Sequence, residues 1–179
     1  LDVLKQENVK ATFFVLGTNT KYNPDLIKRE FDEGHYIANH GYTHKYSTVY
    51  ASPEATLDEY NFTQQAIRDA LGNQNYKSKV FRFPGGSNGG HYHEAKQNSK
   101  AFLRESGIVH LDWNCLSKDA EGANTKEALM QNIIDTMGDK DSVVILMHDA
   151  SDKILTYEML PELISYLREK GYKFQTIYD

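Results

Sequence analysis

Residues 34–44 read Gly34-His35-Tyr36-Ile37-Ala38-Asn39-His40-Gly41-Tyr42-Thr43-His44, and the rest of the chain is arranged around them. A helix is expected to end at Gly34, a short extended run follows, and two histidines come at its end. Neutral imidazole is the commonest protein ligand for zinc, and two imidazoles at this spacing can bind one ion from a helical turn or a tight loop. The segment therefore predicts a metal site at the C-terminal end of a strand, where the catalytic and binding residues of α/β folds usually lie. The alternative is that His40 and His44 have only structural roles.

The length and composition of the chain indicate one globular domain, residues 1–179. Its 179 residues, 40% hydrophobic and 25% charged, are enough for a sizeable core. The formal net charge of -5 argues against a nucleic-acid partner, and the substrate is expected to be neutral, cationic or bound locally. No run of residues is long enough to span a membrane, and no signal peptide is visible. Because the chain begins at Leu1, we expect a signal or anchor to lie upstream of it.

The single cysteine, Cys115, excludes an internal disulfide and a cysteine-based zinc cluster. We expect it to be a small buried hydrophobic side chain. Among the other histidines, His35 and His110 are expected to be structural, whereas His91 and His93 are expected to form an exposed pair beside a pocket loop.

Helices and strands alternate along the chain, and most helices stop at a glycine. Capping residues mark several helix starts: Asn23 before Pro24, Ser52 before Pro53, Thr125 and Thr156. The expected helices cover residues 1–6, 24–33, 53–71, 94–106, 126–137 and 157–170. The expected strands cover residues 10–16, 35–39, 80–83, 108–111, 142–147 and 172–174. This alternation predicts a parallel sheet, either open or closed into a barrel.

Polar side chains gather where the expected strands end. They are Thr18-Asn19, His40 with His44, Arg82 before Pro84-Gly85-Gly86-Ser87, Asp112-Trp113-Asn114 with Asp119, and His148-Asp149. The series resembles the polysaccharide deacetylases of carbohydrate esterase family 4, which share the NodB-homology domain. The resemblance covers nearly the whole chain.

Three motifs carry this resemblance. Asn39 to His44 matches the family's metal-histidine motif, Arg82-Phe83-Pro84 its Arg-x-Pro motif, and Leu146-Met147-His148 its Leu-x-His motif. The resemblance implies an α/β fold, a distorted (β/α) barrel of the NodB type. It also implies a hydrolase that uses one divalent metal ion to remove acetyl groups from N-acetylglucosamine polymers, such as peptidoglycan or chitin-like chains, or from acetylxylan.

The resemblance assigns the ion to His40 and His44. Zinc suits these ligands best, and cobalt, nickel and manganese are the alternatives. Bound in this way, the ion would acidify its water and polarise the acetyl carbonyl.

The resemblance also assigns the catalytic side chains, which are His148, Arg82 and Asp119. His148 would be the general acid, and Arg82 would orient the base. A carboxylate beside His148 would raise its pKa, a role for Asp119 with Asp112 as the competitor. Substrate contacts are expected from Tyr42, Pro84, Gly85, Trp113 and Leu146.

The chain departs from the family's pattern in two places. In the family, a Thr-Phe-Asp-Asp-Gly-type strand supplies the base and the third metal ligand, and its position lies before Leu1. Ala120 stands where the family has a tryptophan that walls one side of the pocket. We therefore expect a protein limited to residues 1–179 to lack the N-terminal strand of the barrel, to bind zinc weakly and to be inactive by itself.

Two functional interpretations remain, with a structural zinc protein as a weaker third. The first is a monomeric metal-dependent polysaccharide deacetylase, extracellular or associated with the cell wall because its substrate lies outside the cytoplasm. The second is a non-catalytic glycan-binding module that has kept the fold. The presence of His148, Arg82 and both metal histidines favours the enzyme.

Overall fold

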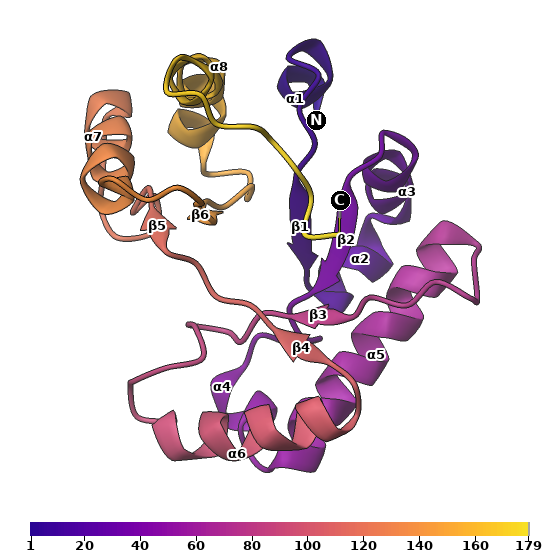
Figure 1. Cartoon of the computed structure of the whole chain (residues 1–179). Helices are drawn as coiled ribbons and strands as arrows, with labels where there is room; N and C mark the ends of the chain where they lie inside the picture. The colour runs from indigo at the N-terminus through magenta and orange to yellow at the C-terminus, as the bar shows by residue number, and fades with distance from the viewer. Residues whose placement is uncertain (179) are drawn as a thin grey trace. The chain divides into compact units, whose positions relative to one another are not determined.

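The computed structural model describes residues 1–178, which form two compact units (Figure 1). Unit 1 joins residues 1–9 to residues 113–174, and unit 2 joins residues 10–112 to the described residues from 175 onward. Each unit therefore combines segments that lie far apart in the sequence. The single domain expected over residues 1–179 stays a prediction.

Unit 2 contains a parallel sheet of four strands in the order β1 (Thr12–Val15), β2 (Tyr36–Asn39), β3 (Val80–Phe81) and β4 (Val109–His110). The register pairs Val15 with Asn39, Asn39 with Phe81, and Phe81 with His110. The last residues of all four strands thus form one row. The segments that follow them, including those that begin with His40 and Arg82, leave the sheet at the same edge.

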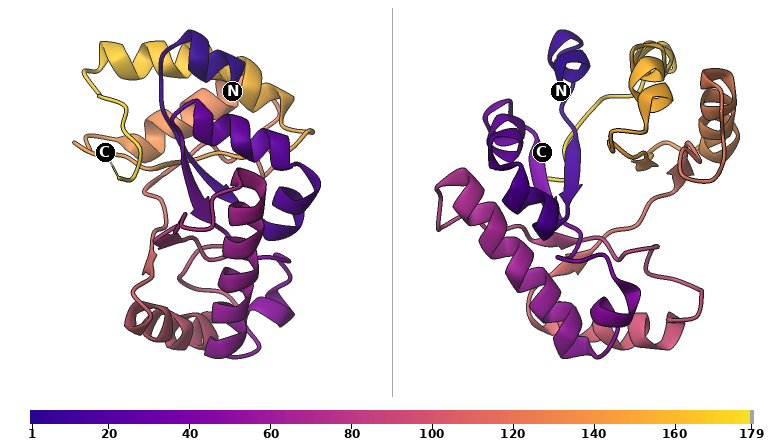
Figure 2. Two further views of the ribbon diagram at one scale, coloured as in Figure 1. Left: turned by 90° about the vertical axis from the view of Figure 1, so that its right-hand side faces the viewer. Right: turned by 180° about the vertical axis from the view of Figure 1, so that it is seen from behind.

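Five helices belong to unit 2: α2 (Gly17–Tyr22), α3 (Pro24–Asp32), α4 (Tyr46–Val49), α5 (Pro53–Leu71) and α6 (His93–Glu105). The Ser52 side chain caps α5, since its Oγ accepts a hydrogen bond from the Ala55 N–H at 3.1 Å, and Gly72 ends the helix with a φ of 60°. Helix α5 packs against α2, α3 and α6 (Figure 2). Its buried face joins a core that contains Val49, Tyr50, Tyr60, Phe81, Phe83, Leu103 and Ile108.

Unit 1 contains α1 (Asp2–Gln6), β5 (Cys115–Leu116), α7 (Lys126–Met137), β6 (Ile145–Leu146) and α8 (Ile154–Glu169). Strands β5 and β6 are parallel neighbours. The core of unit 1 comes mainly from α7 and α8 and includes Cys115, Leu129, Met130, Ile133, Met137, Met159, Leu163 and Leu167. Cys115 is therefore the buried small hydrophobic side chain expected from the sequence. Within residues 1–178, no helix combines the length and the apolar character needed to cross a bilayer.

The structure corrects several expected elements. Helix α8 begins at Ile154 with Lys153 at its N-cap, so the prediction that Thr156 caps it is wrong. Residues 172–174 form no strand, and the expected strand 142–147 is reduced to β6. Helices α2 and α4 and strand β5 were not expected. Helix α2 was missed because Gly17 was taken only as the end of a strand, whereas it is the first residue of the next helix.

Candidate active site

The loop from His40 to His44, here named the histidine loop, directly follows β2 in unit 2. The Nδ1–H of His40 donates to the Arg82 carbonyl oxygen at 2.7 Å, which leaves Nε2 as the atom able to bind an ion. The ring centroids of His40 and His44 lie 5.0 Å apart. An ion about 2.1 Å from a ring nitrogen lies about 3.3 Å from that ring's centroid, so a single ion can reach both rings. The separation of the two rings is therefore compatible with one shared ion, and their role as metal ligands stays a prediction.

Two buried side chains fix the backbone of the histidine loop. Oε2 of Glu59 accepts the N–H groups of Tyr42 and Thr43, each at 2.7 Å, and its Oε1 accepts the Thr43 hydroxyl at 2.9 Å. Oδ1 of Asn39 accepts the Gly41 N–H at 3.0 Å, while its Nδ2 donates to the Tyr60 carbonyl at 2.9 Å. Glu59 was not predicted from the sequence as a site residue. The buried face of α5 also carries Thr56, Thr63 and Gln64, so no break in an apolar pattern marked Glu59.

The ring of Tyr42 packs between α2 and α5. A Cβ added to Gly17 would lie 2.2 Å from Cδ2 of Tyr42, so only glycine fits under this ring. The Tyr42 and Phe62 rings meet edge to face with centroids 5.9 Å apart. The Tyr42 N–H is already bonded to Glu59. A substrate contact by Tyr42 stays a prediction.

Arg82 directly follows β3, at the sheet edge from which the histidine loop also leaves, and is 7% exposed. Its Nε donates to the Leu111 carbonyl at 3.1 Å and its Nη2 to the Asp112 carbonyl at 3.4 Å. The guanidinium carbon lies 3.7 Å from the ring centroid of Phe14. Burial lowers the pKa of Arg82 to about 10, so the side chain remains a cation at neutral pH.

The loop after β3, residues 82–92, is here named the Ser87 loop and is held by hydrogen bonds from several elements. Both carboxylate oxygens of Asp112 accept the Ser87 N–H at 3.0 Å, and Oδ2 also accepts the Ser87 hydroxyl at 2.6 Å. The Tyr50 hydroxyl donates to the Pro84 carbonyl at 2.6 Å. Gly85 has a φ of 72°, and a Cβ there would lie 2.4 Å from the Tyr46 hydroxyl. The expected substrate contact Gly85 is exposed on this loop, whereas Pro84 is buried.

Unit 1 supplies a second, separate pair of side chains. Nδ1 of His148 is hydrogen bonded to Oδ1 of Asp119 at 2.8 Å. Oδ2 of Asp119 accepts the His148 backbone N–H at 2.7 Å and the Thr156 hydroxyl at 3.0 Å. The Asp119 side chain is 4% exposed and that of His148 44% exposed. Of the two aspartates left open by the sequence, Asp119 is the partner of His148, whereas Asp112 accepts hydrogen bonds from Ser87.

The pairing changes both pKa values. Burial alone would raise the pKa of Asp119, but the hydrogen bonds from His148 and Thr156 outweigh it and hold that pKa below its ordinary 3.8. The hydrogen bond to Asp119 raises the pKa of His148 above its ordinary 6.5, against the opposing effect of burial. Because Nδ1 is occupied by Asp119, the proton available for transfer from the imidazolium is the one on Nε2.

We expect the pair to stabilise the protein most between about pH 4 and pH 6.5. The raised pKa of His148 gives stability that is complete below its unfolded-state pKa and is lost as the pH rises through the folded-state value. The lowered pKa of Asp119 gives stability present above its unfolded-state pKa and lost as the pH falls through the folded-state value. In an NMR titration, Asp119→Asn should lower the pKa of His148 relative to wild type, with the exposed His91 as internal reference. An unchanged His148 pKa would contradict this account.

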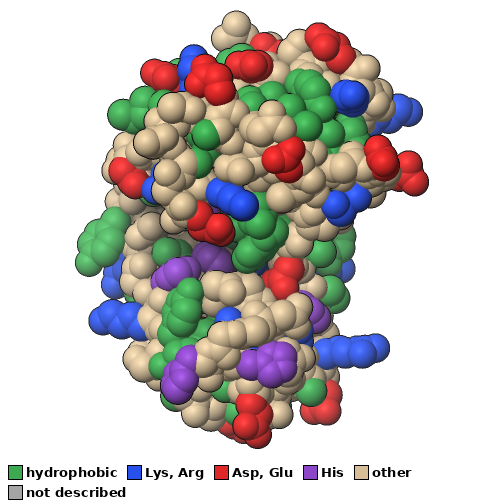
Figure 3. All heavy atoms as spheres, turned by 90° about the vertical axis from the view of Figure 1, so that its left-hand side faces the viewer, with side chains coloured by type: hydrophobic (Ala, Val, Ile, Leu, Met, Phe, Trp, Pro, Cys, Tyr) green, Lys and Arg blue, Asp and Glu red, His purple; other side chains and the backbone are tan. Residues whose placement is uncertain are grey.

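The remaining expected site residues have these surroundings. Trp113 and Leu146 are half-buried in unit 1, and the Leu146 carbonyl accepts the Ser117 hydroxyl at 3.1 Å. His91 and His93 are exposed, as expected from the sequence. Figure 3 shows histidine side chains reaching the surface on the face that it draws.

The metal donor set is incomplete within residues 1–178. No group of three or more histidine, cysteine, aspartate or glutamate side chains in this part of the chain could hold an ion together. His40 and His44 fit two positions of a tetrahedral site, and water or a further carboxylate would have to fill the others. The residues present thus fit a divalent ion as two of its ligands.

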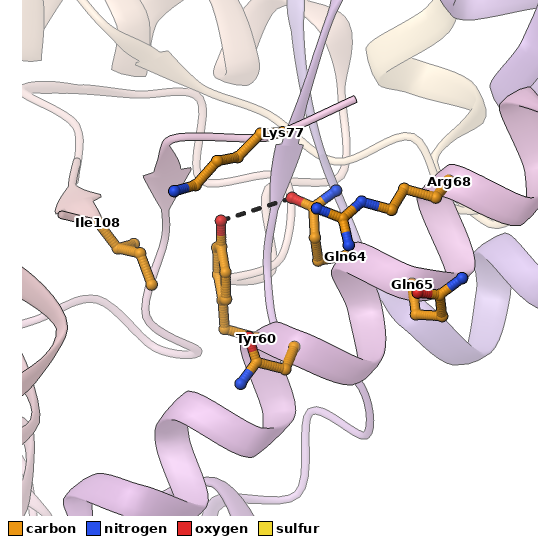
Figure 4. A pocket seen from close by; sticks show the side chains of 7 residues that line it. Tyr60, Gln64, Gln65, Arg68, Lys77 and Ile108 are labelled. Carbon is orange, nitrogen blue, oxygen red and sulfur yellow. Dashed lines mark hydrogen bonds between the residues drawn. The ribbon is translucent and has the colours of Figure 1, made fainter. Parts of the chain in front are cut away.

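Unit 2 also contains a cavity of about 440 Å³ away from these residues (Figure 4). The side chains around it include Tyr60, whose hydroxyl lies 3.4 Å from Oε1 of Gln64, with Gln65, Arg68 and Lys77. None of its lining residues belongs to the histidine loop or the Ser87 loop. This cavity is therefore distinct from the candidate active site.

Comparisons with known proteins place the chain in a family. The family model described as polysaccharide deacetylase matches residues 1–102. A peptidoglycan-N-acetylglucosamine deacetylase of Bacillus cereus is 35% identical over the whole of this chain and 63% of its own length. The chain thus spans less than two thirds of that relative.

Solved structures agree with this match. A Streptococcus mutans CE4 esterase superposes with a TM-score of 0.86 at 32% identity, over 98% of this chain and 77% of that chain. A Bacillus anthracis protein described as a CE4 family pseudoenzyme has a TM-score of 0.79 at 26% identity, over 99% of this chain and 57% of that chain. These likenesses confirm the predicted α/β fold of the NodB type. The chain belongs to the polysaccharide deacetylase family, carbohydrate esterase family 4.

Proposed function

We propose that this chain carries the metal histidines and the general acid of a divalent-metal-dependent deacetylase acting on N-acetylglucosamine-containing polysaccharide. The observation that carries the proposal is the arrangement of His40: its Nδ1 is held by the Arg82 carbonyl, and its ring lies 5.0 Å from that of His44. A histidine oriented through its second nitrogen is typical of metal ligands. Zinc is the proposed ion, with cobalt, nickel or manganese as alternatives.

When bound, the ion would supply an activated water and polarise the acetyl carbonyl. The chain's own residues would do the rest. Water oxygen would add to the carbonyl carbon while the carboxylate base takes a water proton. The C–N bond would then break as the leaving nitrogen takes the Nε2 proton of His148, which gives acetate and a free amine. Asp119 holds the imidazolium in orientation through Nδ1. The buried cation of Arg82 would orient a carboxylate base.

Peptidoglycan is the first substrate to test, because the B. cereus relative is named as a peptidoglycan-N-acetylglucosamine deacetylase. Chitin-like chains and acetylxylan are the alternatives. All these polymers lie outside the cytoplasm, so an extracellular or cell-wall location follows from the proposal. The protein is proposed to act as a monomer.

The alternative function is a non-catalytic glycan-binding module. One observation favours it: within residues 1–178 the histidine loop has no third metal ligand. Ala120, exposed where the family's pattern has a tryptophan, bears on which sugar is accepted. The solved relative from B. anthracis is described as a CE4 family pseudoenzyme. Against it stand the oriented His40 ring and the His148–Asp119 pair, which sugar binding alone does not require.

Acetate release distinguishes the two functions. The substrates are peptidoglycan and N-acetylated chitooligosaccharides, and the proteins are residues 1–179 alone and the same residues preceded by a Thr-Phe-Asp-Asp-Gly-type strand. We expect zinc-dependent, chelator-sensitive activity only with the added strand. Equal chelator-sensitive activity in both would mean that a carboxylate within this chain serves the metal. Glycan binding without acetate release from either protein would favour the binding module.

A further inference from the structure

We propose that Glu59 is a positioning residue for the histidine loop. It would hold Tyr42 and Thr43 so that the rings of His40 and His44 face one divalent ion. The inference rests on the proposed function, because it needs the two histidines to be metal ligands. It adds the group that keeps those ligands in place before the ion arrives.

The contacts of Glu59 all go to residues between the two ligands. Its Oε2 accepts both successive backbone N–H groups, from Tyr42 and Thr43, at 2.7 Å, and its Oε1 accepts the Thr43 hydroxyl at 2.9 Å. Hydrogen bonds to a carboxylate are about twice as strong as bonds between neutral groups. One side chain from α5 thereby fixes the centre of a five-residue loop.

The backbone of the loop needs such a support. Gly41 has a φ of 83° and His44 a φ of 59°, so left-handed residues stand on both sides of Tyr42 and Thr43. A non-glycine residue keeps this conformation only where its surroundings enforce it. A cavity of about 740 Å³, lined in part by Tyr42, Thr43 and Glu59, lies beside the loop. Side-chain packing therefore does not hold the loop on the side of this cavity. The Glu59 carboxylate holds its backbone instead.

Glu59 is buried although it neither caps α5 nor improves the apolar packing of that helix. The residue lies in the interior of α5, where Ser52 already caps the N-terminus, and it is only 4% exposed. Burying a carboxylate is costly unless it is well hydrogen bonded. An apolar side chain would serve packing better, so the bonds to the histidine loop account for a glutamate at this position.

The test compares zinc affinity in wild type, Glu59→Ala, Glu59→Gln and Asp58→Asn. Asp58 is the exposed neighbour on the same helix, so Asp58→Asn is a matched loss of one carboxylate. Zinc is titrated against a chromophoric competitor, and the melting temperature of the metal-free protein is measured in parallel. His44→Ala in the same series reports on the proposed function by itself.

We expect Glu59→Ala to lower zinc affinity 10- to 100-fold, the range typical of residues that orient metal ligands. Glu59→Gln should restore part of the affinity, because its amide oxygen can still accept the two N–H groups and its amide N–H can bond Thr43. Asp58→Asn should bind like wild type.

Two contrary results have different meanings. A lower melting temperature of Glu59→Ala with zinc affinity equal to that of Asp58→Asn would overturn the positioning role and leave the proposed function intact. Equal zinc uptake by wild type and His44→Ala would instead overturn the proposed function, and the metal role of Glu59 with it.

Discussion

His148→Ala is expected to reduce acetate release by about 10²- to 10⁴-fold, the usual contribution of a general acid, while zinc affinity stays at the wild-type level. The loss is large because the leaving amine departs poorly without a proton. Metal binding is expected to survive, since Nδ1 of His148 is bonded to Asp119 and the two proposed metal ligands, His40 and His44, belong to unit 2. The assay is acetate release by the protein with the added acidic strand, together with a zinc titration.

His93→Ala is the control for this prediction, because His93 is an exposed histidine outside both site segments. It should leave both measurements unchanged. A loss of zinc in His148→Ala that matched its loss of activity would show that His148 is a ligand and not the acid.

His44→Asn is expected to lower zinc affinity about 100-fold or more, which exceeds the usual effect of changing a residue that only orients a metal ligand. Asparagine is the informative replacement, because it tolerates the left-handed backbone found at His44 better than alanine does. The fold should therefore survive while one of the two imidazoles is removed. Isothermal titration with zinc measures the affinity, and circular dichroism checks the fold.

Retained affinity in His44→Asn would mean that the 5.0 Å approach of the two rings is a packing contact only. The histidine loop would then have a structural role, and the metal chemistry would have to be sought elsewhere.

The sequence predicted those parts of the fold that depend on local chemistry. The caps at Ser52 and Thr125 were correct, because each side chain bonds an N–H three residues away and needs no tertiary partner. The cap at Thr156 was wrong for the opposite reason. Its hydroxyl bonds Asp119, which lies 37 residues away in the sequence, and no local pattern reveals that contact.

In the candidate site, too, local motifs could be predicted from the sequence, whereas contacts between distant residues could not. His40, His44 and His148 could be named because they stand in short motifs with fixed spacing. The partner of His148 could not be chosen between Asp112 and Asp119, since the choice depends on where β5 and β6 end. Glu59 was missed because its bonds to the histidine loop cross 16 and 17 residues, and a glutamate in a helix ordinarily faces solvent.

The interleaving of the two units sets an order of assembly during synthesis. Apart from its last residues, unit 2 is one continuous run, so the histidine loop and Glu59 can meet while the ribosome is still making the following residues. Unit 1 must wait, because Glu7, the C-cap of α1, pairs with Arg168 of α8, 161 residues later. Contacts over such separations form slowly, since a long loop must close before they stabilise anything. A nascent chain would therefore form the histidine loop with its Glu59 contacts well before the His148–Asp119 pair of unit 1 comes together.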